Sequence, residues 1–319
     1  MADATPFVTL PVDAATGVAA SRPAPMTIGE RAFTWGARTW LMGIINVTPD
    51  SFSGDGLLAG PTGSRPGAGA GVPGAGAGAP VVDATEAALA QGLDMAAQGA
   101  DLLDVGGEST RPGHAVVTEA EELRRVVPAV VALHAALPDL PLSIDSRKPA
   151  VVAAALGAGA ALVNDVAAVV DPSDAVFRVA AEHGVPLVLM HDRAEARYRN
   201  VVAEVIADLQ RAIERALAAG VAWEMLIVDP GMGFGKTAEQ NLALLHDLAA
   251  LRVLGRPVLL GISRKSTLGR VLDLPASERL EGTLASTALG VAAGVDIVRV
   301  HDVGANRRAA AVADAIVRR

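Results

Sequence analysis

The stretch Met225–Lys236 reads MLIVDPGMGFGK and decides the fold. It begins with a short apolar run that ends at Asp229, and it continues into a turn with glycines at positions 231, 233 and 235. An unbroken apolar run of this length is typical of a strand that is buried on both faces, as strands of parallel sheets are. The stretch therefore predicts a parallel strand that carries a carboxylate at its C-terminal end.

The glycine-rich turn does not match the two common nucleotide-binding motifs. A P-loop requires a glycine five residues before its Gly-Lys pair, and Pro230 occupies that position. The dinucleotide-binding fingerprint requires a small residue three positions after Gly233, where this chain has Lys236. What remains is an acid at a strand end, beside a loop whose backbone can approach a ligand closely.

The composition is that of a globular protein with few aromatic residues, since 51% of the 319 residues are hydrophobic and 3% are aromatic. This length fits one large barrel or two smaller domains. Cysteine is absent, which excludes disulfides, thiol nucleophiles and cysteine-ligated metals and fits a reducing compartment, so we expect a cytoplasmic protein. The net charge of -8 argues against non-specific nucleic-acid binding. We expect no signal peptide in the first 21 residues and no membrane-spanning segment.

Strand-like and helix-like stretches alternate from residue 37 onward. The expected strands are 41–46, 101–105, 141–145, 161–165, 186–190, 225–229, 257–262 and 295–300. The expected helices are 83–99, one capped by Thr118, one opening at Pro149, 173–183, 197–220, 239–254, one after Lys265 and a last one to 316. About eight strands that are each followed by a helix predict an α/β fold, the (β/α)8 TIM barrel. The alternative is a doubly wound open sheet.

The sequence predicts a single barrel domain, residues 37–319, with two additions. Residues 1–36 are irregular and contain prolines, which indicates an N-terminal extension or short hairpin. The tract at about 57–82 is rich in Gly, Ala and Pro and has no hydrophobic period. Such a composition buries too little apolar surface to offset the entropy of ordering, so we expect this insertion to be disordered.

Polar residues follow every expected strand, at the end of a barrel where active sites lie. They are Asn46, Asp104, Glu108, Thr110, Arg111, Asp145, Asn164, Asp165, His191, Asp229, Ser263, Arg264, Lys265, Arg299 and His301. A single polar residue after a strand is usually a cap or turn residue, but eight strand ends with such residues favour a site. Asp104 and Asp165 are expected to be structural, and His191 to satisfy a local backbone group.

The residue types indicate the chemistry. Asp145, Asn164 and Asp229 supply acceptors and one amide, which suits a flat heterocycle with adjacent N–H donors. A carboxylate cluster for a metal is the alternative, and the absence of regular His spacing disfavours it. Arg299 and His301 alternate at one strand end and could bind pyrophosphate with Asn46 and Mg²⁺, unless Arg299 pairs with Asp302 at the surface.

Ser263 and the residues after it begin a helix, whose free N–H groups can receive a carboxylate. The alternative is an ordinary helix cap.

Seven stretches carry a family resemblance: MGIINVTPDSFS, DLLDVGGESTRPG, LSIDSRKP, VNDV, VDPGMGFGK, GISRKS and VRVHDV, in this order between Met42 and Val303. They resemble the dihydropteroate synthase family of the pterin-binding barrel superfamily. The resemblance implies a transferase of folate biosynthesis that condenses 6-hydroxymethyl-7,8-dihydropterin pyrophosphate with p-aminobenzoate to 7,8-dihydropteroate and pyrophosphate. It implies Mg²⁺ as cofactor, a homodimer, and a target of sulfonamides.

The resemblance also implies roles for residues at matching positions. Pterin would be bound by Asp145, Asn164, Asp229 and Lys265, and pyrophosphate by Asn46, Arg299 and His301, with Asn46 acting through magnesium. p-Aminobenzoate would be bound by Phe52, Thr110, Arg111, Pro112, Phe234 and Ser263. The catalytic residues would be Asn46, Asp145, Lys265, Arg299 and His301.

The chain departs from the family pattern at three places. The first loop reads Gly54-Asp55-Gly56 where the family has Asp-Gly-Gly, and the insertion follows it directly. Met232 replaces a common Phe, and His191-Asp192-Arg193 replaces Met-His-Met. The loop change keeps one alternative open, a non-catalytic pterin-binding paralogue. A second alternative is a methyltetrahydrofolate methyltransferase of the same superfamily, which the Asn46 loop and the SRK segment disfavour.

Overall fold

The computed structural model describes residues 22–48, 81–108 and 117–318. The first 21 residues and most of the Gly/Ala/Pro tract lie outside the described residues, and so do two loops at the predicted site, within 49–80 and 109–116. Phe52, Thr110, Arg111 and Pro112 belong to these loops.

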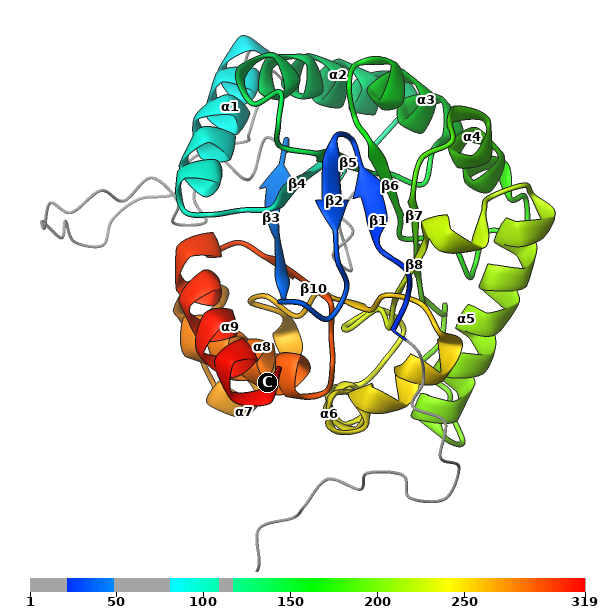
Figure 1. The fold of residues 1–319 in the computed structure, drawn as a ribbon, viewed down its shortest axis with the longest axis vertical. Coiled ribbons are helices and arrows are strands. Elements are labelled where there is room, and N and C mark those ends of the chain that lie inside the picture. Colours follow the sequence, from blue (N-terminus) through cyan, green and yellow to red (C-terminus); the bar gives the residue numbers. More distant parts are fainter. Residues whose placement is uncertain (1–21, 49–80, 109–116, 319) are drawn as a thin grey trace, which may run out of the picture.

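Eight parallel strands form the barrel, in the order β8-β7-β6-β5-β4-β3-β10-β9 (Figure 1). A backbone bridge between Val228 and Val258 joins the two ends of this order. The strands are β3 (Trp40–Asn46), β4 (Leu102–Gly106), β5 (Leu142–Asp145), β6 (Leu162–Asp165), β7 (Leu187–Met190), β8 (Leu226–Asp229), β9 (Leu259–Leu260) and β10 (Ile297–Val300). The TIM-barrel prediction is confirmed, and the open-sheet alternative is wrong.

The helices surround the strands (Figure 1). They are α1 (Val81–Ala97), α2 (Glu119–Ala136), α3 (Pro149–Gly157), α4 (Ala175–His183), α5 (Val201–Ala218), α6 (Ala238–His246), α7 (Ser266–Leu272), α8 (Leu280–Ala292) and α9 (Val303–Val317). The expected helix 239–254 is wrong in its second half, because the chain changes after His246 to a 3-10 helix, Leu248–Leu254. Leu248, Leu251 and Leu254 are spaced by three and all buried, which matches the three-residue turn of that helix.

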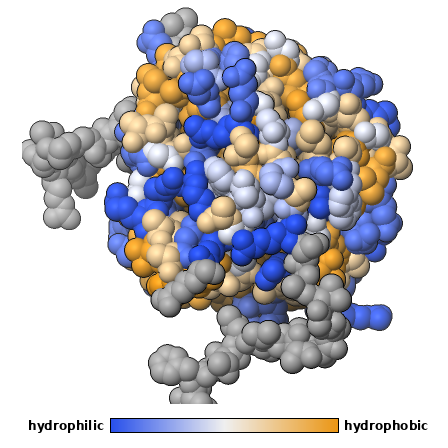
Figure 2. Space-filling model, viewed as in Figure 1, coloured by the Kyte–Doolittle hydropathy of each residue, from blue (hydrophilic) through white to orange (hydrophobic). Residues whose placement is uncertain are grey.

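A small antiparallel hairpin of β1 (Met26–Ile28) and β2 (Arg31–Phe33) closes the N-terminal end of the barrel (Figure 1). Its side chains join a buried cluster with the first residues of the strands, among them Trp40, Leu102 and Ile297. The rings of Phe33 and Trp40 lie 4.5 Å apart. Figure 2 shows the molecule from the same side, with hydrophilic and hydrophobic side chains interspersed on its surface. The opposite end of the barrel, where the strands finish, is the end available for a site.

Candidate active site

Asp104 lies at the centre of a buried ionic network at the C-terminal end of the barrel. Its Oδ2 accepts hydrogen bonds from Nε of Arg299 (2.6 Å) and from Nδ2 of Asn164 (2.9 Å). Nη2 of Arg299 also donates to Oδ2 of Asp145 (2.7 Å). Four strands, β4, β5, β6 and β10, therefore bring these side chains together. Asp104, which was expected to be structural, thus orients two of the predicted site residues.

Two carboxylate oxygens of this network have no partner. Oδ1 of Asp104 and Oδ1 of Asp145 are buried and accept no hydrogen bond from any described residue. Burial raises the pKa of Asp145 to about 7, although the charge of Arg299 opposes this shift. Buried acceptors without donors are costly, so the arrangement favours a ligand that supplies N–H groups.

Asp229 ends β8 and faces the same space. Its Oδ1 accepts the backbone N–H of Gly231 (2.7 Å), and burial raises its pKa while Lys265 opposes the shift. Gly261, which follows β9, has no side chain: a Cβ there would lie 3.7 Å from Oδ2 of Asp229 and 3.9 Å from Cβ of Arg299. The glycine therefore keeps the space beside the carboxylate open.

Lys265 contacts the glycine turn that follows β8. Its ammonium group donates a hydrogen bond to the backbone carbonyl of Met232 and lies 4.5 Å from the centre of the Phe234 ring. Burial lowers the pKa of Lys265 to about 8, and the nearby carboxylate of Asp229 opposes this shift. The predicted pterin residue Lys265 and the predicted p-aminobenzoate residue Phe234 are thus direct neighbours.

Ser263 and His301 form a second pair at the mouth. Oγ of Ser263 lies 2.9 Å from Nδ1 of His301 and accepts the backbone N–H of the same residue (3.2 Å). The guanidinium of Arg264 pairs with Asp302 (3.0 and 2.6 Å). Because Arg264 pairs with Asp302 and Arg299 pairs with Asp104 and Asp145, the alternative ion pair between Arg299 and Asp302 is not formed.

Lys236 ties the glycine turn to the end of β7. Its ammonium group lies 2.9 Å from each of three acceptors: the carbonyl oxygens of Gly231 and Phe234 and Nδ1 of His191. The other ring nitrogen of His191, Nε2, lies 3.0 Å from Oδ2 of Asp208. Burial lowers the pKa of His191 to about 4 and that of Lys236 to about 7. His191 is fully buried behind the turn, so it contacts side chains rather than the backbone group that was expected.

Asn46 ends β3, beside Gly106 of β4. Its side-chain amide makes no hydrogen bond to another described residue. Within the described ranges, no three His, Asp or Glu side chains gather closely enough to hold a metal ion. The other acid expected to be structural, Asp165, accepts the backbone N–H of Ala167 (2.9 Å), a contact that is typical of a turn residue.

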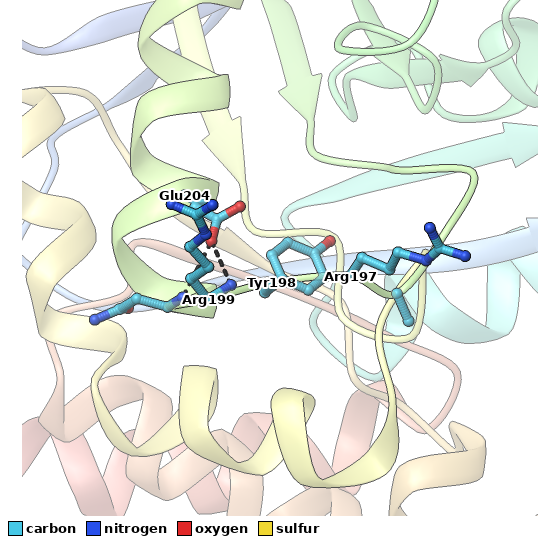
Figure 3. A pocket seen from close by; sticks show the side chains of 6 residues that line it. Arg197, Tyr198, Arg199 and Glu204 are labelled. Atoms are coloured by element: carbon cyan, nitrogen blue, oxygen red, sulfur yellow. Dashed lines mark hydrogen bonds between the residues drawn. The ribbon is translucent and has the colours of Figure 1, made fainter.

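A surface pocket lies beside this site, in the segment before α5 (Figure 3). It is lined by Ala196, Arg197, Tyr198, Arg199, Asn200 and Glu204. The carboxylate of Glu204 accepts the backbone N–H groups of Arg199 (2.7 Å) and Asn200 (3.0 Å), and Tyr198 donates to the carbonyl of Gly235 (3.0 Å). The pocket contains none of the predicted site residues, but its wall supports the glycine turn from outside.

Comparison with known proteins shows the family. The family of pterin binding enzymes matches residues 77–301. The dihydropteroate synthase of Clostridium beijerinckii is 43% identical, over 92% of this chain and 100% of its own length. That of Bacillus subtilis is 42% identical, over 90% of this chain and 91% of its own length.

The chain belongs to the dihydropteroate synthase family. Its activity is therefore that of a transferase of folate biosynthesis. Among solved structures, Xanthomonas albilineans dihydropteroate synthase with 4-aminobenzoic acid is 41% identical with a TM-score of 0.79, and it aligns with 92% of this chain and 98% of its own. The same enzyme in complex with 7,8-dihydropteroate is 40% identical with a TM-score of 0.76, over the same shares of both chains.

Two residues that support the glycine turn or its partner His191, namely Lys236 and Asp208, are not among the residues predicted from the sequence. Lys236 appears in the sequence analysis as part of a nucleotide motif that fails and of the family stretch VDPGMGFGK, without a role of its own, and Asp208 lies within a helix, α5, away from the strand ends. Both residues contact His191, which was identified because it follows a strand. The sequence does not show these contacts, because Asp208 and Lys236 lie 17 and 45 residues away from His191.

Proposed function

We propose that this dihydropteroate synthase condenses 6-hydroxymethyl-7,8-dihydropterin pyrophosphate with p-aminobenzoate at the C-terminal mouth of its barrel, giving 7,8-dihydropteroate and pyrophosphate. The observation that carries the proposal is the pair of buried, unpartnered carboxylate oxygens on Asp104 and Asp145. An aminopyrimidinone ring has adjacent N–H donors that can satisfy such acceptors. The Xanthomonas relatives in complex with 4-aminobenzoic acid and with 7,8-dihydropteroate support this choice of substrates.

The pterin is proposed to lie over the network, bound by Asp145, Asn164, Asp229 and Lys265. Asp229 has one oxygen committed to Gly231, so the other is the natural acceptor for a ligand N–H. Lys265 provides a donor on the opposite side of the same space. Asp104 then acts as a positioning residue, because its Oδ2 holds Asn164 and Arg299 in place.

The leaving pyrophosphate is proposed to bind to Arg299, His301 and Asn46. The contacts of Arg299 use Nε and Nη2, and among the described residues Nη1 has no partner, so Nη1 remains for a phosphate oxygen. Its backbone position, two residues before His301, directs both side chains toward one ligand.

Mg²⁺ fits the residues at this position. Asn46 offers one amide oxygen that no described residue uses, and among the residues that the structure describes no group of three His, Asp or Glu side chains competes for the ion. Magnesium is typically bound through one or two protein ligands together with waters and phosphate oxygens. When bound, the ion would neutralise charge on the pyrophosphate. Asn46 would hold it at the end of β3.

p-Aminobenzoate is proposed to lie above the pterin. Phe234 and Ser263 border this position, and Phe52, Thr110, Arg111 and Pro112, which lie outside the described residues, would complete it. Ser263 accepts the backbone N–H of His301, and its single hydroxyl hydrogen is available to a carboxylate when Nδ1 of His301 is protonated and donates to the same oxygen. This contact couples the p-aminobenzoate and pyrophosphate positions through one side chain.

The reaction breaks the C–O bond to pyrophosphate and forms a C–N bond to the arylamine. The electron pair of the broken bond goes to the pyrophosphate oxygen, where Arg299 and His301 stabilise the growing negative charge. The lone pair of the amine nitrogen attacks the methylene carbon, and one proton then leaves the nitrogen. A neutral arylamine needs correct placement more than a strong base, so positioning by the pocket walls supplies much of the rate.

The test is p-aminobenzoate-dependent release of pyrophosphate from dihydropterin pyrophosphate, with dihydropteroate identified as product. Product formation supports the synthase. Pterin binding without product would favour the non-catalytic paralogue, which the altered loop at Gly54-Asp55 motivates. Methyl transfer from methyltetrahydrofolate would favour the third candidate, although the relatives named above are dihydropteroate synthases.

The arrangement of the whole chain is also a proposal. We expect a homodimer, because large apolar side chains are exposed on neighbouring C-terminal helices, among them Leu289 (60%) on α8 and Val312 (63%) and Ile316 (62%) on α9. Sedimentation of wild type and of Val312→Glu distinguishes a dimer from a monomer. Residues 37–319 would form the barrel domain. No helix in the described part of the chain has the length and hydrophobicity to span a membrane, and the cytoplasm is the proposed location.

A further inference from the structure

The chain uses lysine sparingly, and always at the barrel mouth. Of its 27 lysine and arginine residues, only three are lysines: Lys148, Lys236 and Lys265. They follow β5, β8 and β9 respectively. Each ammonium group donates to protein acceptors: Lys148 to Glu108 and Glu122, Lys265 to Met232, and Lys236 to three partners. The ammonium group of lysine differs from the planar guanidinium of arginine in being a compact cation with three rotatable donors.

The ammonium group of Lys236 uses all three of its donors. An ammonium group has three N–H donors, and Lys236 has three acceptors at 2.9 Å, on Gly231, Phe234 and His191. His191 is fully buried and its Nε2 contacts the carboxylate of Asp208, so Nε2 carries the proton and Nδ1 accepts from Lys236. A neutral amine would leave one acceptor without a donor. A planar guanidinium could not direct its N–H groups to all three.

The backbone of the glycine turn that Lys236 contacts packs closely against His191 and Arg193. Gly231, Gly233 and Gly235 all have positive φ (65°, 82° and 54°). A Cβ at Gly231 would lie 1.7 Å from the carbonyl oxygen of His191, and one at Gly235 would lie 2.1 Å from that of Arg193. The turn is therefore pressed against the end of β7, with two of its carbonyl oxygens directed at one buried cation.

The side of the turn that faces away from His191 contacts the candidate site. The carbonyl of Met232 accepts from Lys265, and the Phe234 ring lies under the same ammonium group. Two lysines thus contact the turn from opposite sides, Lys236 from the side of His191 and Lys265 from the side of the proposed substrates. Removing the Lys236 cation would leave the carbonyl of Phe234 without its donor and the carbonyl of Gly231 with only the backbone N–H of Phe234 (3.1 Å), and the turn would relax.

We propose that Lys236 is a positioning residue for the p-aminobenzoate pocket: its ammonium ion holds the turn Gly231–Gly235 in the shape that places Phe234 against Lys265. This inference rests on the proposed function, in which Phe234 borders p-aminobenzoate. It assigns Lys236 no contact with either substrate.

The test uses the absence of cysteine from the chain. In Lys236→Cys the new thiol is the only one, so alkylation with 2-bromoethylamine under denaturing conditions, followed by refolding, rebuilds a lysine-like side chain at that position alone. Iodoacetamide on the same variant gives a neutral side chain of similar length as the matched control. Wild type passes through the same unfolding and refolding.

We expect Lys236→Cys to raise KM for p-aminobenzoate by about tenfold or more, with smaller changes in kcat and in KM for the pterin substrate. Aminoethylation restores KM, and the neutral adduct does not. Assays below pH 7 keep the group protonated, because burial lowers the pKa of Lys236 to about 7. An unchanged KM in Lys236→Cys, or equal rescue by both adducts, would overturn the inference.

Amide hydrogen exchange of residues 231–235 separates this inference from the proposed function. If refolded wild type makes no dihydropteroate, the proposed function fails, and exchange still decides on Lys236. Faster exchange in Lys236→Cys that only aminoethylation reverses supports the positioning role of the ammonium. Equal exchange in wild type and variant contradicts it.

Discussion

Arg299 and Asp145 are joined across the barrel mouth, with 2.7 Å between Nη2 and Oδ2, although strands β4 and β3 lie between their own strands. The same guanidinium contacts Asp104, so one arginine neutralises a fully buried carboxylate and a largely buried one. This placement puts Arg299 between the proposed pterin floor and the proposed leaving group, and it leads to the first prediction.

Arg299→Ala should lower kcat about 100-fold, since loss of one preorganised donor to a developing negative charge typically costs this much. KM for p-aminobenzoate should change far less, because Arg299 contacts carboxylates of the pterin floor. Steady-state kinetics measures both. Arg307→Ala, which removes an arginine that contacts Asp101 (3.1 Å) instead, is the control. Equal losses in kcat and p-aminobenzoate affinity would contradict a leaving-group role.

Asp229→Asn should weaken binding of the pterin substrate by roughly 1–3 kcal/mol, through loss of a charge-assisted hydrogen bond. Asparagine can still accept the N–H of Gly231, so the turn should keep its shape. Calorimetric titration with a pterin ligand measures the change. Asp165→Asn is the matched control, because that buried acid contacts the backbone of Ala167. Unchanged affinity in Asp229→Asn would remove Asp229 from the pocket.

Gly231→Ala should destabilise the protein much more than Gly255→Ala. Both glycines have positive φ (65° and 63°), so both alanines carry the cost of that conformation, about 1–2 kcal/mol. Only Gly231 adds a collision, since its Cβ would lie 1.7 Å from a backbone oxygen, whereas that of Gly255 would lie 3.6 Å from Trp223. Urea unfolding gives both free energies. Equal costs would show that the turn can move away from His191.

The three lysines should titrate at three different pKa values. Burial lowers the pKa of Lys236 to about 7 and that of Lys265 to about 8. Burial alone would also lower the pKa of Lys148, but hydrogen bonds to Glu108 and Glu122 raise it above its ordinary value. As pH rises, Lys236 should lose its charge first and Lys148 last. NMR of ¹³C-labelled lysine follows all three signals, and a common pKa near 10.5 for all of them would contradict this order.

The sequence predicts the barrel well because its signals are local. Each strand is a short apolar run bounded by turn residues, and the Thr118 cap appears as expected, accepting the N–H of Glu121. The split of the helix 239–254 was not predicted, because Leu248, Leu251 and Leu254 also fit a continuous amphipathic helix. The spacing of three becomes decisive only when all three side chains must be buried together.

The site is predicted in part. Its strand-end residues could be found because parallel strands deliver them to one edge, which is a property of the fold. The network around Asp104 and the partners of Lys236 could not, because they depend on contacts such as Arg299 with Asp104, 195 residues apart. Asp104 is a charged residue in an otherwise apolar strand, and its ion pair with Arg299 explains how its carboxylate can be buried.

The hairpin of β1 and β2 closes the barrel at one end and leaves it open at the other. Its cluster with Trp40, Leu102 and Ile297 closes the floor, so both substrates and both products must pass the same rim. In the proposed arrangement the pterin lies below p-aminobenzoate, nearer to the closed end. We therefore expect substrate binding to be ordered, with the pterin substrate binding before p-aminobenzoate. A ligand that stays bound near the opening should delay the release of a ligand bound below it.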